Sequence, residues 1–331
     1  MKGTTATRGL VIGKFLPPHR GHQYLIDFAR ASVDHLTIQV CTLKRQPIPG
    51  LLRYEWVREA FPDVQVVHNA DENPEYPEDA PETFWETWRR SCLAHMDAPP
   101  THVFAAETYG EPLAALFGAE YVPVDPARAV VPMSGSRLLQ DPTAHWDYLL
   151  PSARPYFLKR VAILGPESSG KTTLASRLAA EFETLWAPEY GRTYLDALPR
   201  TIDAAVMETI ARGHRASETS LARQARRVLI SDTDPIITQV WCEFLLGVVP
   251  PVVKAYIQDS AYDLYLLTDA TEEWVADPQR FLPERHRREQ FHDRCREILT
   301  ALGRPFVFLH GSWEQRQETA QAAITALLHS S

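Results

Sequence analysis

A glycine-rich segment in the middle of the chain has the spacing of a phosphate-binding loop. Residues 165–172 read G-P-E-S-S-G-K-T, which matches the pattern G-x-x-x-x-G-K-T. A β-branched apolar run over 161–164 precedes this segment, and an amphipathic stretch follows it. Because glycine permits tight turns and a helix N-terminus favours anions, successive N–H groups here would point at phosphate oxygens. The segment therefore predicts a nucleoside-triphosphate site, and a simple turn between strand and helix is the alternative.

The side chains of this loop have separate expected tasks. Lys171 is expected to reach the β- and γ-phosphates of ATP, and Thr172 to hold Mg²⁺. The predicted cofactor is therefore Mg²⁺, with ATP as co-substrate. The other loop residues expected to contact ATP are Gly165, Glu167, Ser168, Ser169, Gly170 and Thr173.

A second candidate site lies near the N-terminus, where two histidines stand three residues apart. Residues 13–22 read G-K-F-L-P-P-H-R-G-H. The spacing places His19 and His22 on one face at the start of a helix, where an anion is favoured. Imidazoles can donate hydrogen bonds to phosphate, Lys14 adds a fixed charge, and Gly21 permits close approach to the backbone. The pattern predicts a second triphosphate site, which would also include Gly13 and Phe15.

The composition is that of a globular protein with two domains. The 331 residues carry 45% apolar and 23% charged residues, with a formal net charge of −8, which argues against a general nucleic-acid surface. The four cysteines have no metal-binding spacing, and no apolar run is long enough for a membrane span. We also expect no signal peptide. The predicted location is the cytoplasm, without nucleic-acid or membrane partners.

Strands and helices alternate along both halves of the chain, which predicts an α/β fold with parallel sheets. In the first half we expect strands at 9–13, 36–43, 64–68 and 101–106. In the second half we expect strands at 160–164, 228–232, 263–267 and 305–309. A proline-bearing segment, 141–159, separates the halves, which places the boundary near residue 155. Ligands are expected at the carboxyl ends of the strands.

The N-terminal motif resembles the H-x-G-H signature of the nucleotidyltransferase superfamily. Segments 49–64, 103–110 and 133–142 are similar to successive segments of nicotinamide-mononucleotide adenylyltransferases of the NadR type. The resemblance implies a Rossmann-like domain over 1–154, in which a mononucleotide phosphate attacks the α-phosphorus of ATP. It implies that His19 and His22 bind the ATP phosphates and stabilise the transition state. It also implies triphosphate contacts from Ser134, Ser136 and Arg137, although Leu139 stands where the family motif has arginine.

The second half resembles the ribosylnicotinamide kinases of the same bifunctional family, which implies a P-loop kinase domain over 155–331. In A-P-E-Y-G-R, residues 187–192, Glu189 would accept the proton of a ribose 5′-hydroxyl and Arg192 would hold substrate. Asp232, at the end of an apolar strand, would join Thr172 on the Mg²⁺ side. Asp234 is a candidate for the ribose hydroxyls, and a local turn aspartate is the alternative. Arg280 and Arg285 resemble the arginines of a lid that closes over ATP.

Four aromatic residues are candidates for stacking on a pyridinium ring. These are Trp85 and Trp88 on an expected helix of the first half, and Tyr190 and Trp241 in the second half. Core packing is the alternative for each of them.

Together these resemblances imply an NAD-salvage enzyme with two activities. Its small-molecule partners would be nicotinamide riboside, nicotinamide mononucleotide, ATP and NAD, and a homo-oligomer is possible. The family's N-terminal helix-turn-helix domain is not expected, because the first strand begins by residue 10. Two alternatives remain open: a kinase with an inactive first domain, which Leu139 suggests, and a nucleotide-sensing protein without catalysis.

Overall fold

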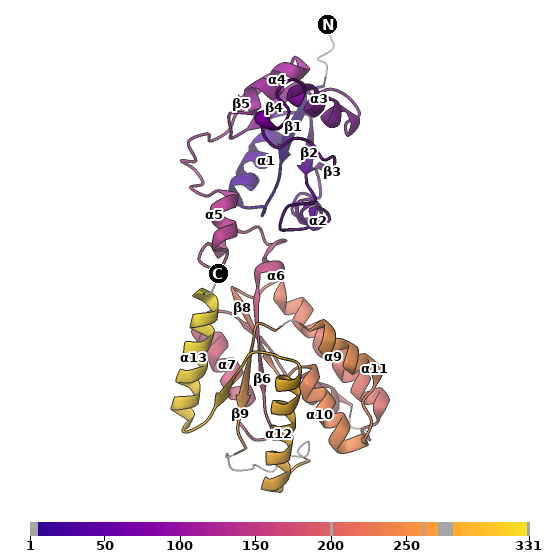
Figure 1. Ribbon diagram of the computed structural model, residues 1–331, viewed down its shortest axis with the longest axis vertical. Helices are drawn as coiled ribbons and strands as arrows, with labels where there is room; N and C mark the ends of the chain where they lie inside the picture. Colours follow the sequence, from indigo (N-terminus) through magenta and orange to yellow (C-terminus); the bar gives the residue numbers. More distant parts are fainter. Residues whose placement is uncertain (1–5, 199–200, 261, 271–280, 330–331) are drawn as a thin grey trace. The chain divides into compact units, whose positions relative to one another are not determined.

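The computed structural model describes residues 6–198, 201–260, 262–270 and 281–329 (Figure 1). The chain divides into two compact units, Met1–Tyr156 and Phe157–Ser331. This division falls two residues beyond the boundary that we expected from the sequence. Each unit contains one five-stranded parallel sheet, so the predicted α/β class is confirmed.

The sheet of the first unit has the order β3-β2-β1-β4-β5. Its strands are β1 (Arg8–Gly13), β2 (His35–Cys41), β3 (Gln65–Asn69), β4 (His102–Ala105) and β5 (Glu120–Pro123). The central strand β1 pairs with β2 from Arg8↔His35 to Gly13↔Val40 and with β4 on its other side. The chain moves outward to β3 and then returns to β4, so β1 and β4 flank the point where strand order reverses. Ligands of open α/β sheets bind at such a point.

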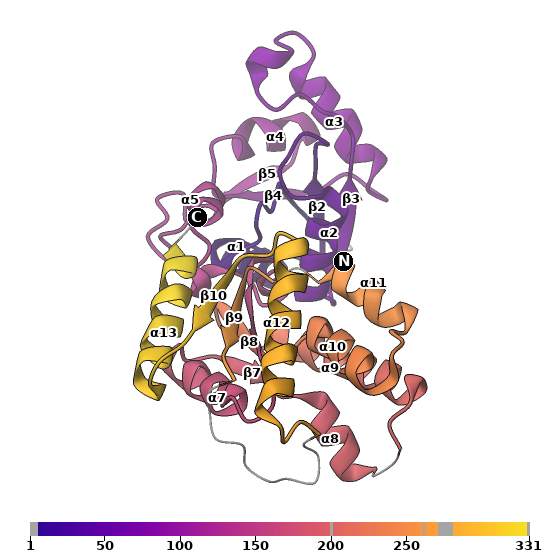
Figure 2. The same ribbon diagram turned by 60° about the horizontal axis from the view of Figure 1, so that its bottom comes forward.

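Four helices cover this sheet. One face carries α1 (Arg20–Ser32) and α2 (Gly50–Ala60), and the other carries α3 (Phe84–Ala94) and α4 (Gly110–Phe117), as Figure 2 shows. Buried Val11, Ile38 and Val40 pack with α1 and α2, whereas Leu10 and Val103 pack with α4. Alternate strand residues thus serve opposite faces, which places the first-unit core on both sides of the sheet. A short helix, α5 (Gly135–Gln140), follows β5.

The sheet of the second unit has the order β10-β9-β6-β8-β7. Its strands are β6 (Lys159–Leu164), β7 (Leu185–Ala187), β8 (Val228–Asp232), β9 (Leu264–Thr268) and β10 (Phe306–Leu309). On one face lie α7 (Lys171–Glu181) and α13 (Trp313–His329). On the other lie α9 (Ala204–Ala222), α10 (Pro235–Leu246), α11 (Pro251–Asp259) and α12 (Arg285–Ala301) (Figure 1). The helix α8 (Tyr190–Ala197) packs on α9.

The sequence missed two of the edge strands. β5 has four residues and ends at a proline, and β7 has three residues. Such short runs carry too few apolar positions for a periodic signal, and their pairing comes from the neighbouring strand. Among the described residues, no helix is long and apolar enough to span a bilayer.

Candidate functional sites

The loop between β6 and α7 has the backbone shape that its glycines permit. Gly165 and Gly170 have φ angles of +146° and +81°, a region that favours glycine. A Cβ atom at Gly165 would lie 2.0 Å from Thr268 Oγ1, so a side chain is excluded there. Buried Ser169 donates to the Pro166 carbonyl and accepts from Thr268 Oγ1, at 2.9 and 2.7 Å. These contacts hold the loop open at the carboxyl end of the sheet.

Thr172 and Asp232 meet beside this loop. Thr172 Oγ1 donates a hydrogen bond of 2.5 Å to Asp232 Oδ2, and Asp232 Oδ1 is buried without a hydrogen-bond partner among the described residues. Burial raises the pKa of Asp232, and the positive charge of Lys171 opposes this rise. A hydroxyl next to an orphaned carboxylate oxygen is the donor set that Mg²⁺ prefers. The two residues therefore fit a magnesium ion. Across the described part of the chain, no group of three or more His, Cys, Asp or Glu residues forms a separate metal cluster.

Glu189 and Lys171 lie at the same cavity, which has a volume of about 420 Å³. Glu189 immediately precedes α8, and burial raises its pKa while the Lys171 charge opposes that rise. Lys171 Nζ donates to the Pro166 carbonyl at 2.8 Å. A half-buried carboxylate with a raised pKa suits a group that must accept a proton. Arg192, the predicted substrate-binding residue, lines the cavity as well, and it is exposed.

The far part of this cavity is apolar. Leu195, Ile202, Met207, Ile210 and Trp241 line it. The sequence predicted only Trp241 among them, as a stacking candidate. The other four come from α8, α9 and the segment just before α9, and their mutual packing is not readable from local pattern. Tyr190 lines the cavity too, and its ring packs against Gly213, where a Cβ atom would lie only 1.9 Å from Tyr190 Cε1.

Two predicted residues of the second unit have other roles in the structure. Asp234 is buried and caps α10, because its carboxylate accepts from Ile237 N at 3.1 Å. It does not line the cavity, so the predicted ribose contact finds no support in this geometry. Burial raises the pKa of Asp234 to about 7. Arg285 forms an exposed pair with Glu289 at 2.9 Å on α12 and does not line the cavity either.

The predicted lid is only partly described. Arg280 lies outside the described residues. Glu167 of the phosphate-binding loop accepts hydrogen bonds from Phe281 N and Leu282 N, at 2.8 and 2.9 Å, and Phe281 lines the cavity. Glu167 therefore anchors the segment that leads into α12.

The two N-terminal histidines form a reciprocal cap at the start of α1. His19 Nδ1 accepts from Gly21 N at 3.0 Å, and His22 Nδ1 accepts from His19 N at 3.2 Å. Their ring centroids lie 3.8 Å apart. Because each Nδ1 accepts a backbone N–H, the neutral rings carry their proton on Nε2 and can donate it to a ligand. A Cβ atom at Gly21 would lie 2.8 Å from the His19 ring, which requires glycine there.

The imidazoles are held in the neutral form. Burial lowers the pKa of His19 to about 4, with a further contribution from the charge of Arg128. Burial also lowers the pKa of His22 well below its ordinary value, with His19 and Arg128 adding to the effect. Arg128 was not among the predicted residues, since it lies on the loop after β5 with no motif around it.

The segment before α5 lies next to His19. A Cβ atom at Gly135 would be 3.0 Å from the Leu16 carbonyl oxygen and 3.9 Å from His19 Nε2. The predicted Ser134 and Ser136 flank this glycine, and Ser134 Oγ accepts from Arg137 N at 3.2 Å. The two predicted phosphate motifs of the first unit are thus brought together. Arg137 itself is exposed on α5.

Gly13 and Phe15 complete the turn after β1. The Phe15 ring is buried in the first-unit core, 4.7 Å from the His22 ring, and Phe15 has a φ of +47°. A Cβ atom at Gly13 would lie 3.1 Å from this ring. The buried Phe15 side chain therefore packs against the His22 ring. Only the backbone of Phe15 is available to contact ATP.

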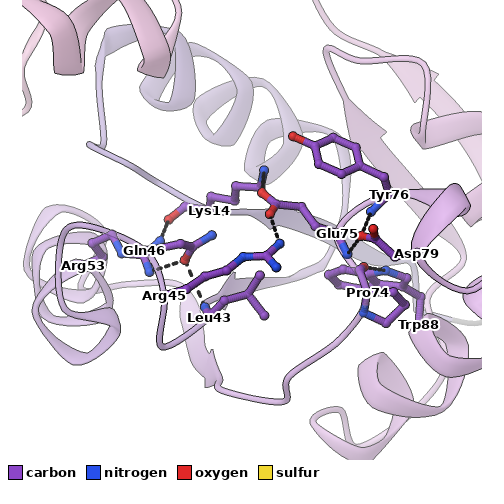
Figure 3. Close-up of polar contacts among 10 residues, drawn as sticks. All are labelled: Lys14, Leu43, Arg45, Gln46, Arg53, Pro74, Glu75, Tyr76, Asp79 and Trp88. Atoms are coloured by element: carbon purple, nitrogen blue, oxygen red, sulfur yellow. Dashed lines mark hydrogen bonds and ion pairs between the residues drawn. The ribbon is translucent and has the colours of Figure 1, made fainter.

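Lys14 is paired with an acidic loop residue (Figure 3). Glu75 forms short ion pairs with both Lys14 and Arg45, and the Lys14 amine lies 5.7 Å from the centroid of the Tyr76 ring. The two cations hold the pKa of Glu75 below its ordinary value. Buried Arg53 donates to the Lys14 carbonyl at 2.5 Å and fixes the backbone beneath this pair.

The side chains of Trp85 and Trp88 both make contacts within the first unit. Trp88 Nε1 donates to the Pro74 carbonyl at 3.0 Å (Figure 3), and Trp85 packs with the cluster around Leu10 and Leu113. These contacts favour the packing alternative over a stacking role.

The fold and the sites together define an α/β protein of two parallel-sheet units, the first with a Rossmann-like strand order and the second with a phosphate-binding loop between β6 and α7. Residues 160–316 match the family described as an AAA domain. The trifunctional NAD biosynthesis/regulator protein NadR of Escherichia coli (strain K12) is 32% identical over 323 residues, covering 91% of this chain and 78% of that protein. The chain belongs to the NadR family.

Two solved structures share the fold over nearly the whole chain. They are crystal structures of NadR protein, one in complex with NR and one in complex with NAD and AMP-PNP. Each has a TM-score of 0.80 and 21% sequence identity, and each covers 99% of this chain. The matches cover 98% and 97% of those two chains, respectively.

Proposed function

We propose that the second unit phosphorylates nicotinamide riboside with Mg-ATP. The proposal rests chiefly on one arrangement, in which Lys171, Thr172 and Glu189 surround a cavity with a polar end and an apolar end. The apolar end suits a flat pyridinium ring, and the polar end suits the ribose and the γ-phosphate. The relation to a NadR protein solved with NR supports this choice of acceptor.

In the proposed kinase step the 5′-hydroxyl oxygen attacks the γ-phosphorus, and the bond from the γ-phosphorus to the bridging oxygen of ADP breaks. Glu189 accepts the hydroxyl proton, Lys171 neutralises charge on the transferring group, and Arg192 orients the acceptor. Thr172 and Asp232 would hold Mg²⁺, which supplies charge neutralisation at the phosphates. The chain's own task is to position two reactants in one cavity.

We propose that the first unit then transfers an adenylyl group from ATP to nicotinamide mononucleotide. An oxygen of the mononucleotide phosphate attacks the α-phosphorus, the bond to the β-phosphate oxygen breaks, and NAD and pyrophosphate form. His19 and His22, as neutral Nε2–H donors, would stabilise charge on the phosphates without transferring a proton. Ser134 and Ser136 lie within the same neighbourhood and would add hydroxyl donors.

The product balance of the purified protein tests this proposal. With nicotinamide riboside, ATP and Mg²⁺, we expect ADP to equal the sum of mononucleotide and NAD, and pyrophosphate to equal NAD, by chromatography. ADP and mononucleotide without NAD would instead favour a kinase with an inactive first unit, which Leu139 and the exposed Arg137 suggest. Nucleotide binding without ADP or pyrophosphate would favour a sensor and reject both activities.

A further inference from the structure

One buried imidazole in the wall of the kinase cavity forms no hydrogen bond within the part of the chain that the structure describes. His214 lies on α9, on the same helical face as Met207 and Ile210, and lines the cavity with them. It is 5% exposed, and neither of its ring nitrogens has a hydrogen-bond partner within the described residues. Leaving a buried imidazole unsatisfied costs free energy, which a hydrogen bond from a bound molecule would recover.

Glu218, one turn further along α9, determines which ring nitrogen of His214 is available. Its Oε1 lies 3.7 Å from His214 Nε2. The same carboxylate accepts from Tyr262 Oη at 2.6 Å and, through a shorter contact, from Ser231 Oγ. Because two hydroxyl donors fix the carboxylate, it favours a proton on the facing Nε2 and leaves Nδ1 as an acceptor. An acceptor nitrogen recognises a ligand group that donates a hydrogen bond.

The position of His214 in the cavity determines which part of a bound nucleoside it would contact. Gly213, the residue before His214, contacts the ring of Tyr190, which directly follows Glu189, so His214 lies toward the reacting end of the cavity. The side chains suited to a pyridine ring, Leu195, Ile202 and Trp241, form the apolar part. The donor next to His214 therefore belongs to the sugar and not to the ring.

We propose that His214 is a specificity-determining residue that accepts a hydrogen bond from a secondary ribose hydroxyl of the acceptor nucleoside, with Glu218 as its positioning residue. This inference rests on the proposed kinase function. It predicts that the second unit selects ribosides over deoxyribosides, because a site built for a hydroxyl rejects an analogue that lacks it. A buried histidine with a purely structural role is the competing explanation.

The test compares nicotinamide riboside with its 2′-deoxy and 3′-deoxy analogues in the full-length protein, wild type and His214→Leu. We expect wild type to prefer the riboside over one analogue by about 10- to 100-fold in kcat/KM. His214→Leu should lower kcat/KM for the riboside by a similar factor and leave that analogue unchanged, with the KM for ATP unaltered. His214→Asn, which keeps a polar atom near the Nδ1 position, should recover part of the preference. His329→Leu, on the exposed end of α13, is the matched control.

An equal loss for all three substrates in both His214 variants would overturn the inference and indicate a structural role. Wild-type behaviour of His214→Leu would overturn it as well. Failure of the proposed function looks different, because wild type would then phosphorylate neither the riboside nor the analogues.

Discussion

Thr172 Oγ1 lies 2.5 Å from Asp232 Oδ2, which ties the first turn of α7 to the last residue of β8. The other oxygen of that carboxylate is buried without a partner among the described residues. The pair thus keeps one charged oxygen ready for a cation at the mouth of the phosphate-binding loop. The structure maintains this oxygen at a cost to stability, since burying an unpaired carboxylate is unfavourable.

Asp232→Asn should show separately how the buried carboxylate affects stability and how it affects the kinase reaction. The amide keeps an acceptor for Thr172 but removes the charge, so we expect the kinase kcat to fall by at least about 100-fold. The midpoint of thermal unfolding should stay at or above the wild-type value, because a buried charge is lost. Asp234→Asn is the matched control: it preserves the α10 cap and should leave kcat nearly unchanged. A normal kcat for Asp232→Asn would refute the metal assignment.

The histidines of the first unit should remain neutral across the physiological pH range. The pKa of His19 is lowered to about 4 and that of His22 lies well below its ordinary value of 6.5. We expect ring ¹⁵N NMR of labelled protein to show the Nε2–H tautomer for both and no titration between about pH 8 and 5.5. His19→Gln and His22→Gln would assign the signals. Titration near pH 6.5, or an Nδ1–H tautomer, would contradict the cap geometry.

The same shifts make the stability of the first unit depend on pH. Below about pH 6.5 the unfolded chain takes up protons on these histidines, while folded His19 resists protonation until about pH 4. The unfolded state therefore binds more protons, and the free energy of unfolding should fall as the pH drops through this window. Denaturant titrations of wild type and His22→Gln would measure it, and the slope should be shallower in the variant. Equal slopes would exclude His22 as a source.

Glu75→Gln should make Lys14 and Arg45 available to anionic substrates. Glu75 neutralises both cations in the structure, so a phosphate must compete with its carboxylate. We expect the KM for nicotinamide mononucleotide in adenylyl transfer to fall severalfold, with a smaller change in kcat. The Lys14 and Arg45 side chains are 48% and 65% exposed, so the free energy of unfolding should change by no more than about 1 kcal/mol. Glu78→Gln in the same loop is the control, and a raised KM in Glu75→Gln would argue against competition.

The sequence predicted those site residues that lie together in short motifs. The loop at 165–172 and the pair His19 and His22 depend on local glycines and on helix starts, which the motif spells out. Pairing of Thr172 with Asp232 was also predictable, because parallel strands bring their carboxyl ends to one edge. The cap made by Asp234 had a local signal too, an aspartate followed by proline at a helix start, which favours a cap over a ligand role.

Other contacts between distant segments were not predictable. Lys14 and Glu75 are 61 residues apart, and their pairing depends on where the loop after β3 returns. His214 sits in the interior of a long helix, where a histidine gives no sign of facing a cavity. Its place in the cavity wall depends on the packing of α8 and α10 around α9, which follows from tertiary structure alone.

If one polypeptide uses ATP at two separate sites, single variants should remove the two reactions independently, and a pair of variants tests this directly. Product formation from nicotinamide riboside and from nicotinamide mononucleotide would be followed for Lys171→Ala and His22→Ala. We predict that Lys171→Ala still converts mononucleotide to NAD but leaves the riboside unreacted. His22→Ala should still convert riboside to mononucleotide but form almost no NAD. Loss of both reactions in either folded variant would contradict the existence of two independent sites.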